Sequence, residues 1–175
     1  PSKENKAIKL IRTLKDGMKI ESVILKEKKY NTLCISSQVG CPVDCKFCLT
    51  GVGGFKRQLT AYEIVEQVLM ANQTGHTISN IVFMGMGEPL LNSKQVFKAI
   101  DLLNHEDLFH MSKRRMTLST SGYLKGIQQL IDEERYMNLA FSVGCTDLKV
   151  REKIMPIEKR NPFVDVVRDR KSTRL

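Results

Sequence analysis

The sequence predicts an α/β protein in which an N-terminal β-hairpin precedes an incomplete (β/α) barrel, that is, a partial TIM barrel. Two observations support this fold class. β-prone runs alternate along most of the chain with segments whose apolar residues recur at helical spacing, a pattern typical of a parallel sheet with α crossovers. The first two β-prone runs are instead joined by a two-residue turn, which favours an antiparallel hairpin. About four parallel strands can be counted, too few to close a barrel, so we expect an open sheet edge.

The N-terminal elements follow from local patterns. Residues 6–14 and 19–25 are β-prone, and Asp16-Gly17 between them is a strong hairpin-turn pair. A third strand is expected over 30–36. It leads into a stretch that is rich in glycine and cysteine and has little periodicity, which is typical of a long functional loop.

Helices and strands then alternate as far as residue 154. Thr60-Ala-Tyr-Glu63 is a capping box that predicts a helix start, and Ser93 begins a second amphipathic helix. The apolar stripe of that second helix consists of Val96, Phe97, Ile100 and Leu103. The other elements expected are strands over 78–84, 115–120 and 137–143, and helices over 123–133 and 147–154.

These elements divide the chain into three parts. We expect a hairpin segment over 1–29, a barrel core over 30–160, and a tail over 161–175 to which no element can be assigned. The apolar rhythm fades after Pro156, and the first residue is not methionine. We therefore expect the chain to be a portion of a longer protein.

Composition bounds the class of protein. At 175 residues with 42% hydrophobic content, the chain fits one globular domain. It contains no run of about 18 apolar residues and opens on no charged and then apolar leader, so neither membrane insertion nor export is expected. Five cysteines, three of them within eight residues, indicate a metal and a reducing compartment rather than disulfides. We expect the protein in the cytoplasm.

The charge balance favours a polyanionic partner. Lys and Arg number 28 against 19 for Asp and Glu, which gives a net charge of +9. The cations are concentrated in the first 29 residues, in Lys113-Arg114-Arg115 and in the last eight residues. Such a surplus attracts nucleic acid. A solvated basic surface that binds nothing in particular is the open alternative.

Three cysteines, Cys41, Cys45 and Cys48, follow the third expected strand at spacings of four and three. Iron–sulfur clusters are normally held by four cysteines, so three leave one iron free to take a small molecule. An open coordination position of this kind is what distinguishes catalytic metal sites from structural ones. The alternative is a structural zinc site completed by Cys34 or Cys145.

Further candidate residues follow the other expected strands, where the active sites of parallel α/β sheets collect. Gly87 lets a ligand approach the backbone, and Glu88 offers a carboxylate to an ammonium group. Ser119 and Ser142 have hydroxyls for a carboxylate or a ribose. The alternatives are a tight turn with a solvated glutamate, and serines that cap helices. Lys113–Arg115 is either a phosphate contact or a charged surface turn.

The motifs occur in the order of one known family. They are Glu21-Ser-Val, Cys34-Ile-Ser-Ser-Gln-Val-Gly-Cys41, Cys45-Lys-Phe-Cys48, Gly85-Met-Gly-Glu-Pro-Leu-Leu-Asn92, Ser112-Lys-Arg-Arg115, Thr117-Leu-Ser-Thr-Ser-Gly122 and Met155-Pro-Ile157. The chain resembles the radical SAM (S-adenosylmethionine) adenine C2-methyltransferases of 23S ribosomal RNA and some transfer RNAs. A sister group methylates C8 of the same adenosine. The resemblance covers residues 6–157 and implies a partial barrel of the radical SAM type.

The resemblance also implies a cofactor set and a mechanism. Cys41, Cys45 and Cys48 would ligate a [4Fe-4S] cluster, with SAM on the fourth iron. The residues that would hold SAM are Gly87, Glu88, Ser119 and Ser142. An electron donor such as flavodoxin would reduce the cluster, and the reduced cluster would split SAM into methionine and a 5′-deoxyadenosyl radical. In the family this radical acts on a methylated cysteine, whose methyl carbon then adds to the adenine. Cys34 resembles the cysteine that releases the product through a disulfide, and Glu21 the proton acceptor.

The chain departs from the family at two points. Ser142-Val-Gly-Cys-Thr146 lacks the family's histidine, which is replaced by Gly144. The methyl-carrying cysteine belongs to a C-terminal half that these 175 residues do not include; Cys145 is no stand-in and is expected to be buried and inert. We therefore expect the chain to be inactive on its own. Radical SAM chemistry on a peptide or a glycyl-radical enzyme, and a non-catalytic module that binds metal and RNA, are the alternatives.

Overall fold

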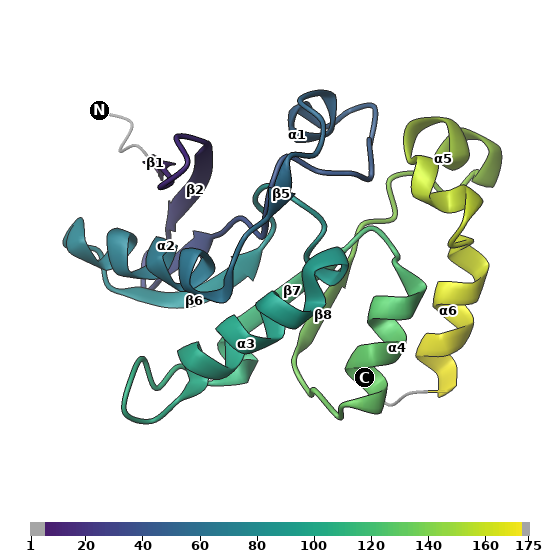
Figure 1. The fold of residues 1–175 in the computed structure, drawn as a ribbon. Coiled ribbons are helices and arrows are strands. Elements are labelled where there is room, and N and C mark those ends of the chain that lie inside the picture. Colours follow the sequence, from purple (N-terminus) through teal and green to yellow (C-terminus); the bar gives the residue numbers. More distant parts are fainter. Residues whose placement is uncertain (1–5, 173–175) are drawn as a thin grey trace.

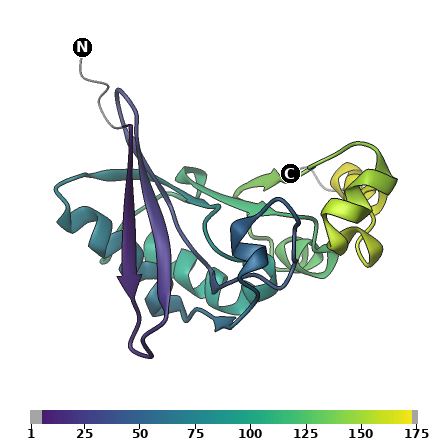
Figure 2. The ribbon, with the colours of Figure 1, turned by 90° about the horizontal axis from the view of Figure 1, so that it is seen from above.

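The computed structural model describes residues 6–172, so Pro1 to Asn5 of the hairpin segment and Arg174 of the C-terminal basic group lie outside the described residues. One six-stranded sheet, in the order β1-β2-β3-β6-β7-β8, organises the fold (Figure 1). Helices pack on it, which confirms the α/β class. Seen from above, the β1–β2 hairpin stands at one end of the molecule and α5 and α6 at the other (Figure 2).

The elements have the following bounds. The strands of the main sheet are β1 Ala7–Thr13, β2 Lys19–Lys26, β3 Asn31–Cys34, β6 Ile78–Phe83, β7 Met116–Thr120 and β8 Asn138–Phe141, and a small second sheet pairs β4 Gln38–Val39 with β5 Arg57–Gln58. The α-helices are α1 Leu49–Val52, α2 Ala61–Gln73, α3 Ser93–Asn104, α4 Leu124–Asp132, α5 Leu148–Ile154 and α6 Phe163–Ser172. Short 3-10 helices span Pro89–Asn92, Lys113–Arg115 and Pro156–Lys159.

The strand directions agree with the sequence-based prediction. β1 and β2 pair antiparallel, and the turn between them is closed by Asp16, whose carboxylate accepts from the N–H of Met18 at 3.1 Å. Gly17 supplies the left-handed φ of +82° that the turn requires. β2 also pairs antiparallel with β3, whereas β3, β6, β7 and β8 are parallel. The hairpin therefore covers one edge of a four-stranded parallel sheet.

The core lies between one face of the sheet and the helices α2, α3 and α4, which run along that face (Figure 1). The sheet contributes Ile24, Leu33, Ile81, Met116 and Leu118, each 0% exposed. All four residues of the stripe expected in α3 are buried. Burial of so much apolar surface is the main stabilising term of the fold. The opposite face of the sheet is only partly buried.

The segment beyond residue 160, to which the sequence pattern assigned no element, contains α6. Its charged residues hide the pattern, but Val166 is 8% exposed and packs with the core, and Phe163 stacks on Phe141 with 5.4 Å between ring centroids. Among residues 6–172, no helix is long and apolar enough to cross a membrane.

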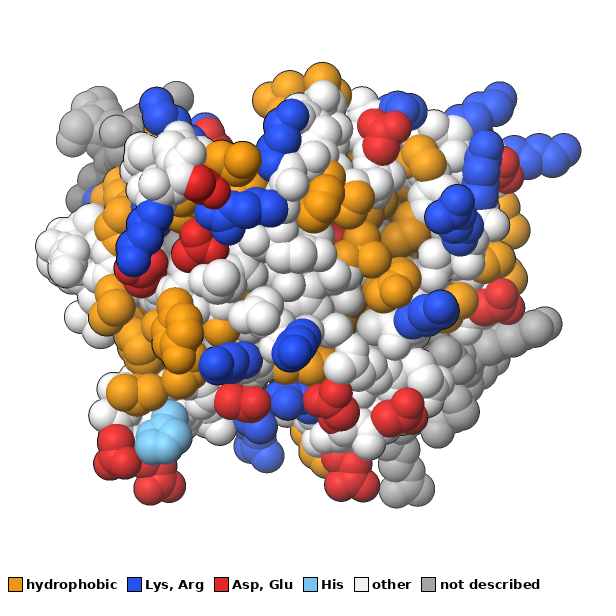
Figure 3. Space-filling model, viewed as in Figure 1, with side chains coloured by type: hydrophobic (Ala, Val, Ile, Leu, Met, Phe, Trp, Pro, Cys, Tyr) orange, Lys and Arg blue, Asp and Glu red, His pale blue; other side chains and the backbone are white. Residues whose placement is uncertain are grey.

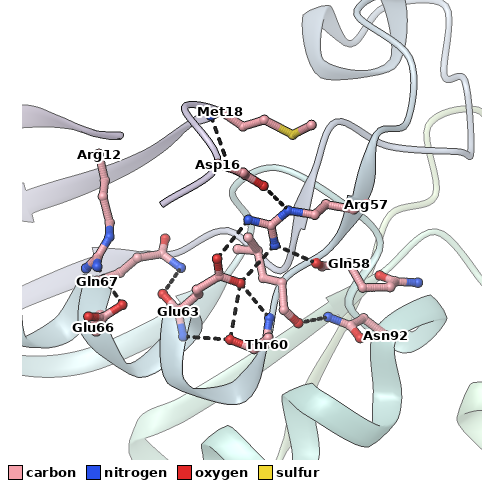
Figure 4. Close-up of polar contacts among 11 residues, drawn as sticks. Arg12, Asp16, Met18, Arg57, Gln58, Thr60, Glu63, Glu66, Gln67 and Asn92 are labelled. Carbon is pink, nitrogen blue, oxygen red and sulfur yellow. Dashed lines mark hydrogen bonds and ion pairs between the residues drawn. The ribbon is translucent and has the colours of Figure 1, made fainter. Parts of the chain in front are cut away.

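A polar cluster ties the hairpin turn to the start of α2 (Figure 4). The capping box is present as predicted, because Thr60 and Glu63 exchange side-chain and backbone hydrogen bonds. Arg57 donates two hydrogen bonds to the Glu63 carboxylate, at 2.8 and 2.9 Å, and one to Asp16 at 2.6 Å. The hairpin turn, β5 and α2 are thereby fixed to one another.

This cluster makes the stability of the fold depend on pH. The hydrogen bond from Arg57 is the main cause that lowers the pKa of both Glu63 and Asp16. A carboxylate with a lowered folded-state pKa stabilises the fold above its unfolded pKa, and that stabilisation is lost as pH falls through the folded pKa. Arg57→Met is therefore expected to lower the free energy of unfolding by about 1 kcal/mol at pH 7. The difference from wild type should shrink below about pH 4. Urea unfolding between pH 7 and pH 3 measures it, and a constant difference would mean that Arg57 acts by packing alone.

Candidate cofactor-binding cavity

A cavity of about 420 Å³ opens at the carboxyl ends of the parallel strands, where the sequence predicted the site. Five chain segments line it. They are the loop over residues 37–59 after β3, here called the cysteine loop, the end of β6 with the turn that follows, the end of β7 with its turn, the end of β8 with Ser142, and Met155 at the end of α5. Seven of the nine predicted site residues line this one cavity, namely Cys41, Cys45, Cys48, Gly87, Glu88, Ser119 and Ser142. Hydrophobic side chains gather in the same region, between α1 and α5 (Figure 3).

The three cysteines surround the cavity as free thiols. Burial raises the pKa of Cys41, and burial together with the neighbouring Cys41 and Cys48 raises that of Cys45 to about 11. Among the described residues no three His, Cys, Asp or Glu side chains converge as they would on a single metal ion. Neither Cys34 nor Cys145 lines the cavity, so the zinc site considered above has no fourth cysteine there.

The cysteine loop is closed at its base by buried amide side chains. Asn92 donates to the carbonyls of both Ser37 and Leu59, each at 2.8 Å, so one side chain holds the two ends of the loop. Gln67, on α2, bonds both the N–H and the C=O of Ser36, at 2.8 and 2.9 Å. Figure 4 labels both amides. No pattern in the sequence distinguishes Gln67, and Asn92 is distinguished only as the last residue of the motif that begins at Gly85.

A glycine is required at position 87 because the backbone packs closely against Gln38, in addition to letting a ligand approach the backbone. The φ of Gly87 is +102°, and a Cβ there would lie 2.6 Å from the side chain of Gln38. Gln38 in turn accepts from the N–H of Glu88 at 2.8 Å and donates to the side chain of Gln58 at 2.8 Å. The turn after β6 is therefore locked to the base of the cysteine loop.

Glu88 is 4% exposed, so it is not the solvated glutamate of the alternative interpretation. Burial raises its pKa, while hydrogen bonds to the carboxylate oppose the shift. Ser121 donates both its N–H and its hydroxyl to one carboxylate oxygen, each at 2.7 Å, and the N–H of Leu90 lies 3.3 Å from the other oxygen. The sequence pointed to Ser119 rather than to Ser121, although both belong to the same motif.

The two predicted serines line the cavity from neighbouring strands. Ser119 is half-buried on β7, and Ser142 is exposed directly after β8, where its N–H bonds the carbonyl of Thr120 at 2.9 Å. Beneath Ser142 lies Arg151, which is 0% exposed and pairs with Glu158 at 2.7 Å. Neither member of this buried ion pair was anticipated, because a short charged helix is usually a surface helix.

Gly144, which stands where the family has histidine, adopts a left-handed φ of +68°. A Cβ there would lie 2.5 Å from the sulfur of Met155, and that sulfur accepts from Arg151 at 3.0 Å. Met155 therefore approaches the backbone of Gly144 too closely for a side chain to fit there without a shift. Cys145, expected to be buried, is only partly so.

We expect Gly144→Ala to lower the free energy of unfolding more than the left-handed strain of about 1–2 kcal/mol alone would do. Gly75→Ala is the matched control, because Gly75 has a φ of +80° and nothing within 4 Å of its added Cβ. Chemical denaturation of both variants isolates the contribution of the contact with Met155. Equal losses would show that this contact relaxes without cost.

Two predicted residues lie outside the cavity. Glu21 is on β2, where its carboxylate pairs with Lys9 at 3.0 Å. Cys34 ends β3, is half-buried, and has its pKa raised by burial. Lys113–Arg115 precedes β7 and so lies at the amino end of that strand, away from the cavity.

Comparison with known proteins agrees with this geometry. Residues 35–171 match the model of the radical SAM superfamily. A probable dual-specificity RNA methyltransferase RlmN of Thermus thermophilus is 43% identical over 171 residues, which are 95% of this chain and 48% of that protein. The ribosomal RNA large subunit methyltransferase Cfr of Clostridium botulinum is 45% identical over 163 residues, which are 93% of this chain and 47% of that protein.

A solved structure is also similar. The crystal structure of a radical SAM methyltransferase from Sphaerobacter thermophilus superimposes with a TM-score of 0.88 and 35% identity, over 95% of this chain and 50% of that one. The chain spans about half the length of the curated relatives that it matches. With the family model covering most of its residues and three cysteines around a cavity at the strand ends, the chain belongs to the radical SAM superfamily.

Proposed function

We propose that the chain is the part of an RNA adenine methyltransferase that binds an iron–sulfur cluster and SAM, and that the target atom is C2 of an adenosine in 23S ribosomal RNA, with some transfer RNAs as further substrates. One observation carries this proposal. Residues from five chain segments, including three free cysteines and the buried Glu88, line one cavity at the strand ends. The two named RNA methyltransferases, at 43% and 45% identity, support the reaction class.

The residues present fit a [4Fe-4S] cluster. Cys41, Cys45 and Cys48 provide three thiol ligands around a cavity of about 420 Å³, and cysteine thiolates are the ligands that hold such clusters. Because burial keeps the free thiols of Cys41 and Cys45 protonated, uptake of iron would release protons. When bound and reduced, the cluster together with SAM would supply a 5′-deoxyadenosyl radical.

The other cavity residues would orient SAM. Glu88 would accept a hydrogen bond from the ammonium group of SAM, since the bonds from Ser121 and Leu90 do not use all of the acceptor capacity of its carboxylate. Ser119 and Ser142 would bond the carboxylate or ribose. The apolar lining would keep water away from the reacting atoms.

Glu21 and Cys34 would act on the substrate side. Glu21 is on β2 of the hairpin, and Cys34 ends β3, the neighbouring strand. The hydroxyl of Ser36 donates to the backbone carbonyl of Glu21 at 2.6 Å and so links the two strands. The Glu21 carboxylate, which pairs with Lys9 at 3.0 Å, would accept a proton from the adenine ring. Cys34 would form a disulfide with the methyl-carrying cysteine, and the sulfur–carbon bond between that cysteine and the product would break as the carbon takes up a proton.

Cations suited to an RNA backbone surround the cavity end of the molecule. Exposed lysines and arginines stand over α5 and the segment after it (Figure 3). Lys46 belongs to the cysteine loop, and Lys149, Lys153 and Lys159 belong to α5 and its continuation. Neutralised phosphates would release counterions and strengthen binding at low salt. An electron donor such as flavodoxin completes the proposed set of partners.

Methylation at C8 is the second candidate, because the Cfr relative is as similar to this chain as the RlmN relatives are. A chimera decides between the two. Residues 6–172 replace the aligned half of the Thermus relative, and the reconstituted protein is incubated anaerobically with a 23S RNA fragment and SAM. Mass spectrometry of the digested RNA is expected to find 2-methyladenosine. Finding 8-methyladenosine instead would favour the second candidate, and an unmodified RNA, with the Thermus parent active, would refute both.

SAM binding by the chain itself separates an enzyme portion from a non-catalytic module. After anaerobic reconstitution, equilibrium dialysis is expected to find about one SAM per chain, because the cavity residues are all within these 175 residues. A module that binds only metal and RNA would retain no SAM.

A further inference from the structure

Arg151 is a buried cation that donates hydrogen bonds to three residues lining the cavity, Ser121, Ser142 and Met155. It lies on α5, is 0% exposed, and has one charged partner, Glu158, at 2.7 Å with 7% exposure. A buried ion pair is costly to desolvate, so its presence calls for further hydrogen bonds on the remaining donors. Arginine has five donors in a planar fork, two more than lysine.

Those remaining donors bond main-chain carbonyls of two different loops. The Nη2 group donates to the carbonyl of Ser121, after β7, at 2.8 Å. The Nη1 group donates to the carbonyl of Ser142, after β8, at 3.0 Å, and also to that of Val143. One guanidinium therefore fixes the spacing between the loops that follow two neighbouring strands.

Both loops carry residues proposed to contact SAM. Ser142 is proposed to contact SAM directly. Ser121 is proposed to act through Glu88, whose carboxylate accepts hydrogen bonds from the Ser121 N–H and hydroxyl at 2.7 Å each. A continuous path of hydrogen bonds thus runs from Arg151 through Ser121 to Glu88. A shift of the guanidinium would move both ends of the proposed SAM site.

The surroundings leave Arg151 little freedom. Its guanidinium lies 5.4 Å from the ring centroid of Phe141 and 5.7 Å from that of Phe163, and the two rings stack on each other. Glu158 uses its second carboxylate oxygen to accept from the N–H of Phe163 at 2.9 Å, so the ion pair is held by the start of α6 as well.

We propose that Arg151 is a positioning residue for SAM, which sets the distance between Glu88 and Ser142 by holding the carbonyls of Ser121 and Ser142. This inference rests on the proposed function, since it concerns the same cavity. It goes further in assigning the geometry of the site to a residue that does not line it.

The test separates positioning from a merely structural ion pair. Arg151→Met leaves Glu158 buried without its cation, so both stability and SAM affinity should fall. The double variant Arg151→Met/Glu158→Gln removes the charge on both partners and keeps an acceptor for Phe163. We expect it to recover most of the thermal stability and to keep the iron content of wild type after reconstitution. Its dissociation constant for SAM, from equilibrium dialysis, should still be raised by about tenfold or more.

Two further variants make the result unambiguous. Arg151→Lys keeps the charge next to Glu158 but cannot reach all the carbonyls, so it should fold and show the same weakening of SAM binding. Arg135→Met is the matched control, because Arg135 pairs with Asp101 and Glu133 and stacks over Phe97 away from the cavity. It should lower stability and leave SAM affinity unchanged.

Hydrogen exchange of the cluster-free chain provides a measurement that does not depend on SAM. In the double variant and in Arg151→Lys, the Ser121 amide should exchange faster than in wild type and in Arg135→Met, because its bond to Glu88 is no longer held in place. Wild-type exchange at Ser121 together with wild-type SAM affinity in the stable variants would overturn the inference. A wild-type chain that bound no SAM would count against the proposed function instead, while the exchange data would still decide the role of Arg151.

Discussion

Replacing Cys45 by alanine is expected to abolish the iron–sulfur chromophore that anaerobic reconstitution should give the wild-type chain. Cys45 is one of three cysteines around the cavity, and the described residues bring no fourth cysteine to its wall. With two thiols left, a [4Fe-4S] cluster has too few protein ligands to be retained. The brown colour, the charge-transfer absorption and the bound iron should therefore all be lost.

The matched control for this prediction is Cys145→Ala. Cys145 is a free, partly buried cysteine that does not line the cavity, so its removal should leave iron content and absorption unchanged. If Cys45→Ala retained the full absorption, the three-cysteine assignment would be wrong. If wild type bound zinc and no iron under the same conditions, the cluster proposal would fail as a whole.

Asn92→Ala is expected to lower the free energy of unfolding by about 2 kcal/mol, because it leaves the buried Leu59 carbonyl without a donor, and leaves the Ser37 carbonyl with only the Leu59 N–H at 3.2 Å. Asn92 is 6% exposed, and its amide bonds the carbonyls of Ser37 and Leu59 at 2.8 Å each. Small domains have about 5–15 kcal/mol of stability in total, so this loss is large. Because the two carbonyls mark the ends of the cysteine loop, iron uptake should also become slower and less complete.

Asn138→Ala provides the comparison. Asn138 also donates its amide to a carbonyl, that of Arg114 at 2.7 Å, but at an exposed position where water can replace it. Its loss should cost no more than about 1 kcal/mol. Urea unfolding of the cluster-free variants, followed by iron titration, tests both points. Similar losses for the two variants would mean that the base of the loop rearranges to satisfy its carbonyls.

Patterns that depend on neighbours in the chain predicted most of the fold. The hairpin turn at Asp16-Gly17, the capping box at Thr60 and the stripe of α3 are local features, and each is present where expected. The helix α6 near the end of the chain was not predicted. Val166 packs into the core, but α6 has charged residues between its apolar ones, so the helical periodicity is weak.

The site was predictable where chemistry limits the choice of residue. Thiols at short spacing indicate a metal, and a glutamate between a glycine and a proline after a buried strand indicates a ligand, so Cys41 and Glu88 could be chosen as candidates, and both line the cavity. Arg151 could not, because nothing in a short charged helix indicates that it packs against two strand ends. Ser121 was missed for a similar reason: which serine of a motif reaches Glu88 depends on how the loop after β7 turns.

Because segments far apart in the chain line one cavity, the uptake of cofactors should depend on how far folding has progressed. Cys41 and Met155 both line the cavity, so its walls are complete only after β8 and α5 have docked onto the rest of the sheet. Contacts between residues so far apart in sequence form slowly during folding. The cysteine loop closes over a much shorter stretch, so its thiols should gather while the SAM-binding walls are still open. Iron supplied during refolding would then reach the cysteines before the rest of the cavity has formed. Iron supplied after refolding should therefore give the higher yield of intact cluster.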